Sequence, residues 1–380
     1  MNRFSDRSHY LKRFKRRRIP GMAPSQGRRV RLRDVAERAG VSVGSASQAF
    51  GRPELVSEQV RERVLAAAKD LGYTGPDPAA RRLRTGRTGV LGLIFAERLG
   101  YQFTDPAAPA FLRGVARGMQ KAPLGLLLLP DSRYREEAAR TVREAAVDGF
   151  IVYSAPRNDP RVEVALARRL PAVTVDQPRG TATPFVGIDD RAAARAAAEH
   201  LRELGHERVG VLSFIRALDR EGTLVLDMTL ERLEGYKEGL GAAWEERLVR
   251  ICRPNAAEPA RRAALELLRE PRPPTAILAM SDVLAIGALQ AADELGVSVP
   301  AELSLAGFDD SPAAALATPP LTTVAQPHEE KGRIATEQLL DAIEQRAEPE
   351  KPPTRVILPT ELVVRESTAP VKRERAISSA

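Results

Sequence analysis

The sequence predicts a small all-helical part at the N-terminal end, followed by a larger α/β body. Residues 31–73 contain short stretches in which apolar residues recur at helical spacing, separated by glycines. From Val90 onward, short apolar runs alternate with longer helical stretches, a pattern typical of a parallel sheet covered by helices. With 380 residues, the chain is long enough for two or three domains.

The positive charge is concentrated toward the N-terminus. Residues 1–88 carry 21 Lys/Arg and 8 Asp/Glu, whereas residues 89–369 carry 34 and 41. This asymmetry indicates that the N-terminal end meets a polyanion, although a solvated charged face gives the same counts. Residues 1–28 form a basic arm expected to be disordered. They are either a phosphate-contacting arm or an upstream extension without a selected role, since Met22 would itself serve as a start.

Several function classes are disfavoured by composition. Cys252 is the only cysteine, so a disulfide within the chain is impossible, and this is consistent with a reducing compartment. No 18-residue apolar run and no secretory signal pattern occur, and we expect a cytoplasmic, nucleoid-associated protein. The four histidines lack metal-ligand spacing, and no phosphate-binding glycine motif occurs. We therefore expect no metal and no cofactor.

Residues 29–74 are predicted to form three short helices. Gly40 ends the first helix, Ser42 can cap a second that runs to about Phe50, and Ser57 can cap a third that ends at Gly72. The apolar face of the first helix consists of Leu32, Val35, Ala36 and Ala39. The buried side of the third is expected to consist of Val60, Val64, Leu65, Ala68 and Leu71.

Residues 34–48 have the pattern of a helix-turn-helix. Small residues stand where the two helices would cross, and short hydroxyl side chains stand at the start of the second helix. There, backbone amides and hydroxyls can approach DNA phosphates and base edges. The hydroxyls expected to contact phosphates belong to Ser42, Ser45 and Ser47. A helical hairpin without a DNA role is the alternative.

Residues 75–88 are predicted to be a hinge and linker, with one or two marginal helical turns at 79–84. The body is assigned to residues 89–366 and a tail to 367–380. Strands are expected at 90–95, 124–129, 150–153, 172–175, 209–212, 276–279, 303–306 and 361–364. Helices are expected at 133–147, 190–204, 228–240, 256–269 and 282–295.

The chain resembles the lactose-repressor (LacI/GalR) family of bacterial transcriptional regulators over residues 31–366. The motifs that carry the resemblance are 33–43 (RDVAERAGVSV), 56–73 (VSEQVRERVLAAAKDLGY), 80–88 (ARRLRTGRT), 274–282 (PTAILAMSD), 307–310 (GFDD) and 320–327 (PLTTVAQP). Several motifs in the same order make chance agreement very unlikely.

The resemblance implies how DNA is contacted. Base contacts are expected from Val43, Gly44 and Gln48, at the start of the second helix. Gln48 stands where the family usually has Arg, and glutamine would read adenine instead of guanine. The resemblance also implies a hinge helix that orders on DNA and enters the minor groove. Its expected contacts are Ala80, Leu83 and Arg84, with a plain basic linker as the alternative.

For the body, the resemblance implies a two-lobed α/β fold of the type I periplasmic-binding-protein kind, with an effector bound between the lobes. The expected effector contacts are Arg232, Asp282, Asp309, Gln326 and Asp176. Their alternative roles are an ion pair for Arg232, helix caps for Asp282 and Asp309, and a hinge contact for Gln326. Ser281 replaces the family's usual Asn, which weakens any transfer of effector identity. The aromatics Phe95, Tyr101 and Phe103 are expected to pack in the core or to stack on a ligand.

These observations predict a sequence-specific regulator of transcription and not an enzyme. We expect a homodimeric repressor on near-palindromic double-stranded operator DNA, controlled by a sugar or sugar derivative. An activator and a nucleoside effector remain open alternatives. A hydrolase is disfavoured because the G-x-S-x-G pattern at 40–44 follows a helix and not a strand. An exported solute-binding protein would lack the helix-turn-helix.

Overall fold

The computed structural model describes residues 30–75, 86–95, 106–120, 123–129, 135–214, 227–344 and 353–371. The chain divides into two compact units, one ending at Gly86 and one beginning at Arg87. The basic arm, Tyr101 and Phe103 lie outside the described residues, as do the minor-groove positions Ala80, Leu83 and Arg84.

The N-terminal unit, hereafter the head, contains the three expected helices. They are α2 (Leu32–Ala39), α3 (Val43–Gly51) and α4 (Glu58–Asp70), with a short 3₁₀ turn at Pro53–Leu55. Gly40 adopts the left-handed conformation, with φ of 63°, and ends α2 as expected. Ser42 and Ser57 cap α3 and α4 by accepting hydrogen bonds from Ser45 N and Val60 N.

The core of the head is built from small residues. Val35, Ala36, Ala46 and Val64 are buried where the helices meet, so the expected crossing of α2 and α3 is present. One prediction was wrong, because Leu65 is 42% exposed. Ala67, which was not predicted there, is buried beside the predicted Val64 and Ala68, since a smaller side chain lets the helices approach more closely.

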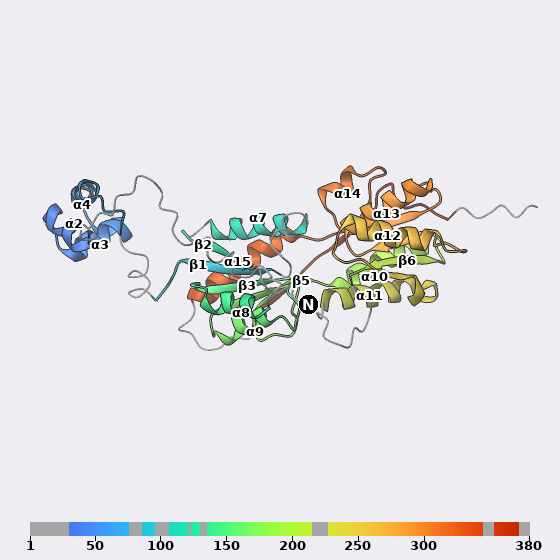
Figure 1. Ribbon diagram of the computed structural model, residues 1–380, viewed down its shortest axis with the longest axis horizontal. Helices are drawn as coiled ribbons and strands as arrows, with labels where there is room; N and C mark the ends of the chain where they lie inside the picture. The colour runs from blue at the N-terminus through green and yellow to red at the C-terminus, as the bar shows by residue number, and fades with distance from the viewer. Residues whose placement is uncertain are drawn as a thin grey trace, which may run out of the picture. The chain divides into compact units, whose positions relative to one another are not determined.

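The second unit, hereafter the body, has two α/β lobes (Figure 1). Lobe 1 has a sheet in the order β11-β5-β4-β3-β1-β2, with every pairing parallel. Its strands are β1 (Val90–Phe95), β2 (Gly125–Leu129), β3 (Gly149–Tyr153), β4 (Ala172–Val175), β5 (Phe185–Ile188) and β11 (Arg355–Leu358). Its helices are α7 (Ala107–Met119), α8 (Arg135–Glu144), α9 (Pro160–Ala167) and α15 (His328–Glu344).

The two faces of the first sheet carry different helices. Helices α7 and α15 cover one face, where Phe111 stacks on Tyr153 with ring centroids 3.9 Å apart. Helices α8 and α9 cover the other face, packing through residues such as Val142 and Ala165 (Figure 1). Phe95 is fully buried in the first of these cores, which confirms core packing for that aromatic.

Lobe 2 has a sheet in the order β12-β10-β9-β8-β6-β7, in which only the pairing of β12 with β10 is antiparallel. Its strands are β6 (Val209–Ser213), β7 (Val249–Ile251), β8 (Ala276–Ala279), β9 (Ser304–Asp309), β10 (Thr322–Ala325) and β12 (Glu361–Val363). Its helices are α10 (Asp190–Glu203), α11 (Asp227–Leu240), α12 (Ala257–Leu268), α13 (Asp282–Leu295) and α14 (Pro312–Leu316), with 3₁₀ turns at Gly241–Ala243 and Glu246–Leu248. The α10–α11 and α12–α13 pairs lie on opposite sides of this sheet (Figure 1).

The chain passes between the lobes three times. The crossings follow β5, β10 and β11, so each lobe is assembled from separate parts of the sequence. The C-terminal residues also belong to lobe 2, which corrects the predicted boundary at residue 366. Ser367 is fully buried, receives a hydrogen bond from Thr322 N and donates one to Leu305 O. Val371 N donates to Leu204 O.

The expected strands of the body are present with small changes of boundary. Those at 90–95, 172–175 and 276–279 match to the residue, and β9 extends to Asp309. Four strands (β5, β7, β10 and β11) and four helices (α7, α9, α14 and α15) are additional to those expected. Among the described residues, no helix combines the length and apolar character that a membrane span requires.

Candidate functional site

The residues expected to contact DNA bases lie on one exposed face of α3. Val43 is 47% exposed, and Gly44 and Gln48 are also exposed. Ala46 and Ala49, on the opposite side of the helix, are buried in the core of the head. The helix thus presents the three predicted positions to solvent, on a frame fixed by small buried side chains.

Two of the serines at the start of α3, Ser42 and Ser45, form hydrogen bonds with each other. Ser42 Oγ accepts from Ser45 N at 3.0 Å, and the two hydroxyl oxygens lie 2.9 Å apart. A cap of this kind satisfies one of the free amides of the first turn. Ser42 therefore has a structural role in addition to the expected phosphate contact, while Ser47 has a partly exposed side chain.

In the body, strained backbone marks the ends of three strands. Ser154, Asp176 and Asp309 have positive φ angles of 51°, 61° and 114°, and they stand at the ends of β3, β4 and β9. Non-glycine residues adopt such angles at a cost, and they cluster at ligand sites where the surrounding structure holds them. Carboxyl ends of parallel strands are also where open α/β sheets bind ligands.

A chain of polar side chains connects the two lobes. Lys331, at 0% exposure on α15, donates to Asp176 Oδ1 at 2.6 Å and to Gln326 Oε1 at 2.5 Å. Gln326 Nε2 in turn donates to Asp309 Oδ1 at 2.5 Å. Burial alone raises the pKa of the Asp176 carboxyl, but the Lys331 ammonium outweighs it and the pKa lies below its usual value. Asp176 is therefore ionised in a site that excludes water.

Arg232 lies on α11 and is also buried. Its Nε donates to Asp190 Oδ1 at 2.9 Å, its Nη1 donates to Met280 O at 2.7 Å, and its guanidinium lies 3.7 Å from the centre of the Phe308 ring. Burial lowers the pKa of Arg232, but Asp190 and Asp309 raise it above the usual value. Arg232 thus keeps its positive charge, and its guanidinium lies beside the ends of β8 and β9.

Both carboxylate oxygens of Asp282 have internal partners, as do those of Asp176, which accepts from Lys331 and Ser154. Thr323 Oγ1 donates to Oδ1 at 2.5 Å, and Ser311 N donates to Oδ2 at 2.6 Å. Burial raises the pKa of Asp282 to about 7, and the nearby Asp309 carboxylate adds to the effect. Ser281, not Asp282, is the cap of α13. The geometry makes Asp282 a residue that joins α13 to β10 and to the start of α14.

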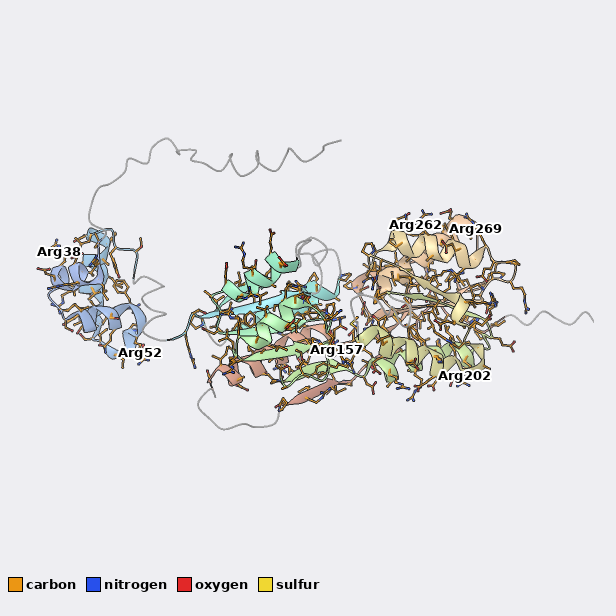
Figure 2. The ribbon with its side chains drawn as sticks, turned by 60° about the horizontal axis from the view of Figure 1, so that its bottom comes forward. Arg38, Arg52, Arg157, Arg202, Arg262 and Arg269 are labelled. Atoms are coloured by element: carbon orange, nitrogen blue, oxygen red, sulfur yellow. The ribbon has the colours of Figure 1, made fainter. Side chains whose placement is uncertain are left out.

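Two arginines of lobe 1 reach carboxylates of lobe 2. Arg157, where the lobes meet (Figure 2), donates to Asp227 Oδ1 at 2.9 Å. Arg179 Nη2 donates to Asp190 Oδ2 at 2.7 Å, so Asp190 binds Arg179 and Arg232 at once. Asp190 therefore connects Arg232 to the interface between the lobes.

The structure brings four of the five predicted effector residues into two hydrogen-bonded networks, and it adds residues that the sequence did not indicate. Asp176, Gln326 and Asp309 share one network with Lys331, while Arg232 belongs to the network of Asp190. No sequence motif marks Lys331 as a site residue. A lone lysine on an amphipathic helix is ordinarily exposed, so its burial could not be predicted from the sequence. Among the described residues, no group of three potential metal ligands occurs.

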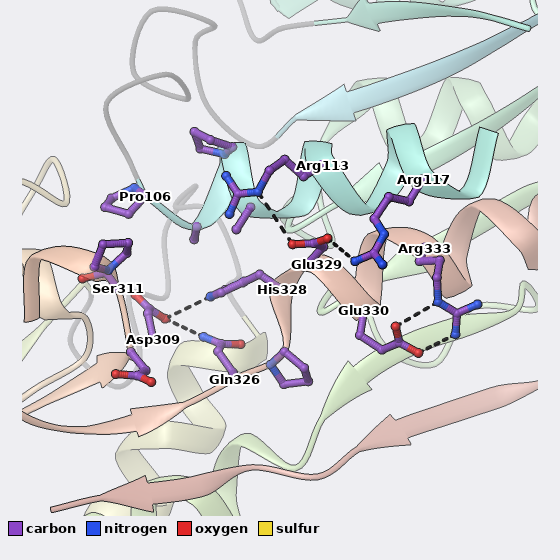
Figure 3. A pocket seen from close by; sticks show the side chains of 16 residues that line it. Pro106, Arg113, Arg117, Asp309, Ser311, Gln326, His328, Glu329, Glu330 and Arg333 are labelled. Carbon is purple, nitrogen blue, oxygen red and sulfur yellow. Dashed lines mark hydrogen bonds and ion pairs between the residues drawn. The ribbon is translucent and has the colours of Figure 1, made fainter. Parts of the chain in front are cut away.

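A cavity of about 690 Å³ opens beside this network. It lies between the start of α7, the end of β9 and the start of α15 (Figure 3). Asp309 and Gln326 line it together with His328, whose ring points toward Asp309 with Nε2 3.7 Å from Oδ1. A volume of about 300–1,000 Å³ is usual for small-molecule sites. The cavity and the polar network thus meet at two shared residues.

Comparisons with known proteins match both units. Residues 31–75 match the family model of bacterial regulatory proteins, lacI family, and residues 198–368 match a periplasmic binding protein-like domain. An HTH-type transcriptional regulator of Mycobacterium tuberculosis is 40% identical over 335 residues, 84% of this chain and 92% of the relative.

Two solved structures cover nearly the whole chain. A complex of the transcriptional regulator CelR with cellobiose has a TM-score of 0.66 and 30% identity, covering 89% of this chain and 100% of that one. The lac repressor dimer bound to operator and the anti-inducer ONPF has a TM-score of 0.74 and 26% identity, covering 90% and 99%.

Proposed function

This chain belongs to the lacI family of bacterial regulatory proteins and is a DNA-binding regulator of transcription, and we propose that it is a carbohydrate-controlled repressor. In this proposal, a homodimer binds a near-palindromic operator through α3 of each head. A sugar or sugar derivative binds between the lobes of the body and changes the affinity for DNA. The similarity to the operator-bound lac repressor dimer supports the DNA half, and the similarity to CelR with cellobiose supports the effector half.

The observation that carries the effector half is the connected chain from Asp176 through Lys331 and Gln326 to Asp309. These groups can donate and accept hydrogen bonds in pairs, as sugar hydroxyls require. The chain spans both lobes, so a ligand that replaces its internal bonds alters the contacts that hold the lobes together. A difference in contacts between two states is what couples one site to another.

The observation that carries the DNA half is the exposed face of α3 with Val43, Gly44 and Gln48. We propose that Gln48 reads adenine with a two-pronged hydrogen bond and that Val43 contacts a thymine methyl. Gly44 adds no side chain, so the backbone of the helix can approach the groove closely. The serines at the helix start contact phosphates in the same docking geometry.

The experiment begins with selection of operator DNA from a random pool by the purified protein. Enrichment of a near-palindrome is expected, with a dissociation constant of about 10⁻⁸–10⁻¹¹ M at physiological salt. Mono- and disaccharides, with nucleosides in parallel, are then titrated into the protein–operator complex. Release by one sugar and loss of that response in Asp309→Asn, with unchanged DNA affinity, support the proposal. Asn tolerates the positive φ of this position better than most residues.

Each half can fail separately. If no DNA sequence is enriched, the head does not bind DNA sequence-specifically. If only nucleosides release the DNA, the effector is not a carbohydrate. If the sugar increases DNA affinity, the regulator uses its effector as a corepressor and the proposed direction of control is wrong.

A further inference from the structure

The cavity beside the polar network is larger than the predicted contacts require. Of its lining residues, only Asp309 and Gln326 belong to the predicted effector set. Arg232, Asp176 and Asp282 do not line it. The cavity therefore continues the effector cleft past Asp309, toward the starts of α7 and α15 (Figure 3).

His328 is a buried side chain with unused hydrogen-bonding capacity. It is 8% exposed, and neither Nδ1 nor Nε2 has a hydrogen-bond partner among the residues that the structure describes. Its ring points into the cavity toward Asp309, at a distance of 3.7 Å that is too long for a hydrogen bond. Buried polar groups without partners are uncommon, because each costs free energy until a ligand or water binds it. A neutral imidazole offers one donor and one acceptor, which a hydroxyl group can satisfy together.

The charges around the cavity are largely compensated within the protein. Arg117 binds Glu329 at 2.5 Å, and Arg333 forms an ion pair with Glu330 (Figure 3). Asp310 accepts from Arg365 at 2.6 Å. With Arg113 and Asp309 included, the described lining carries three arginines and four carboxylates, so it offers no excess of positive charge and favours an uncharged ligand over an anion.

The rest of the described wall is apolar, apart from Ser311, whose side chain caps α14. The residues that form it are Pro106, Ala107, Pro109, Ala110, Pro312 and Pro327. Pyrrolidine rings and methyl groups present flat C–H surfaces without hydrogen-bonding groups. A sugar ring has an apolar C–H face and a rim of hydroxyls, so it can lie against this wall while its hydroxyls reach His328. Apolar walls with a few placed polar groups are the usual composition of a small-molecule site.

We propose that this cavity is a second carbohydrate subsite and that the effector is a disaccharide. One ring binds at Asp309 and Gln326, and the second ring occupies the cavity, with a hydroxyl held by His328. This inference rests on the proposed function, because it extends the same effector site. It adds a residue and a ligand size that the predicted contacts do not supply.

The test compares disaccharides with the monosaccharides that compose them, by calorimetric titration of the full chain. The panel consists of cellobiose, maltose, trehalose, lactose and sucrose, with glucose, galactose and fructose. We expect at least one disaccharide to bind more tightly than either of its components. In His328→Ala, its affinity should fall roughly tenfold, as for the loss of one or two hydrogen bonds, while monosaccharide affinity stays unchanged.

Two further variants control the experiment. His328→Gln keeps one donor and one acceptor and should recover part of the affinity. His200→Ala removes a histidine of α10, outside the cavity, and should leave all affinities unchanged. Because His328 has no hydrogen-bond partner among the described residues, its removal leaves none of them unsatisfied, and thermal unfolding of each variant verifies the fold.

The contrary results are distinct. An equal loss of mono- and disaccharide binding in His328→Ala would place His328 in the first subsite and overturn the proposal. Monosaccharide binding without tighter disaccharide binding overturns the second subsite and leaves the proposed function intact. If no carbohydrate binds, both the subsite and the carbohydrate effector are wrong, while operator selection still decides the DNA half.

Discussion

Lys331 Nζ lies 2.6 Å from Asp176 Oδ1, and both side chains are almost completely removed from solvent. The pair joins α15 to the end of β4 and, through Gln326, reaches Asp309 of the other lobe. Removing charges from water is costly, so neither partner of such a pair is stable in its charged form without the other. The pair therefore holds α15 against the end of β4 and connects lobe 1 to Asp309 through Gln326.

Replacing Lys331 by Met should destabilise the body strongly, since it leaves the Asp176 carboxylate buried and unpaired. The expected loss in the free energy of unfolding is about 3–5 kcal/mol, measured by urea denaturation. The double variant Lys331→Met/Asp176→Asn should recover part of it. Arg195→Met serves as a control, because its pair with Glu199 is exposed and 3.8 Å long. Equal stability of Lys331→Met and the natural protein would show that the ion pair is not required.

Asp282→Asn should change how stability depends on pH. The pKa of Asp282 is raised to about 7 by burial and by Asp309, so the unfolded chain loses this proton at lower pH than the folded one. Stability from this group is fully present below pH 3.8 and is lost as the pH rises toward 7. The difference in the free energy of unfolding between variant and natural protein should therefore grow in favour of the variant from pH 4 to 7. A difference that is independent of pH across this range would mean that Asp282 ionises normally.

Gln48→Arg should alter the operator that the head selects. An arginine at this position prefers guanine N7 and O6, whereas glutamine prefers adenine N6 and N7. The variant should bind the original operator less tightly by about 1–3 kcal/mol and enrich a site with guanine at one symmetric position. The matched control is Gln59→Arg, an exposed glutamine of α4 outside the predicted face. An unchanged selected sequence would remove Gln48 from the base contacts.

Ser42→Ala should loosen the start of α3, because it removes the acceptor for Ser45 N. The expected cost is about 1 kcal/mol, measured as faster hydrogen exchange of the first amides of α3. Ser57→Ala is a comparison at α4, where the corresponding bond is longer, at 3.4 Å. A larger effect at Ser57 than at Ser42 would contradict the order that these distances predict.

Much of the fold follows from local patterns in the sequence. Strand β8 is a continuous apolar run and β4 departs from one only at Thr174, as expected for parallel strands covered on both faces, and the bounds of both match the prediction. The helix caps at Ser42 and Ser57 could also be predicted from the sequence, since side-chain capping depends on residues a few positions apart.

Helix α7 was not predicted from the sequence, and its composition supplies a physical reason. Helix α7 contains Pro109, Gly114 and Gly118, which lower helix propensity. A Cβ at Gly114 would lie 1.8 Å from the Glu329 carbonyl oxygen, so glycine permits the close approach of the two helices. Tertiary packing thus outweighs local propensity here, and only the folded structure contains that information.

The effector site was predictable where it coincides with strand ends. Asp309 and Asp176 follow apolar runs, but Lys331 and His328 lie on or at the start of a helix that only the second crossing brings to the cleft. Their roles depend on neighbours that lie far away in the sequence, such as Asp176, which Lys331 contacts. Spacing along the chain does not encode such neighbours.

The pairing of Phe185 on β5 with Arg355 on β11 has a consequence for the protein during its synthesis. At about 5–20 residues per second, a ribosome needs roughly 10–30 s to proceed from one of these strands to the other. During this time β5 of lobe 1 lacks its partner strand β11, while the ribosome synthesises nearly all of lobe 2. Lobe 2 in turn receives β12 only after β11. The nascent chain therefore has one strand in each lobe, β5 and β10, that still lacks a partner. Both sheets are completed only when the last strands, β11 and β12, have been synthesised.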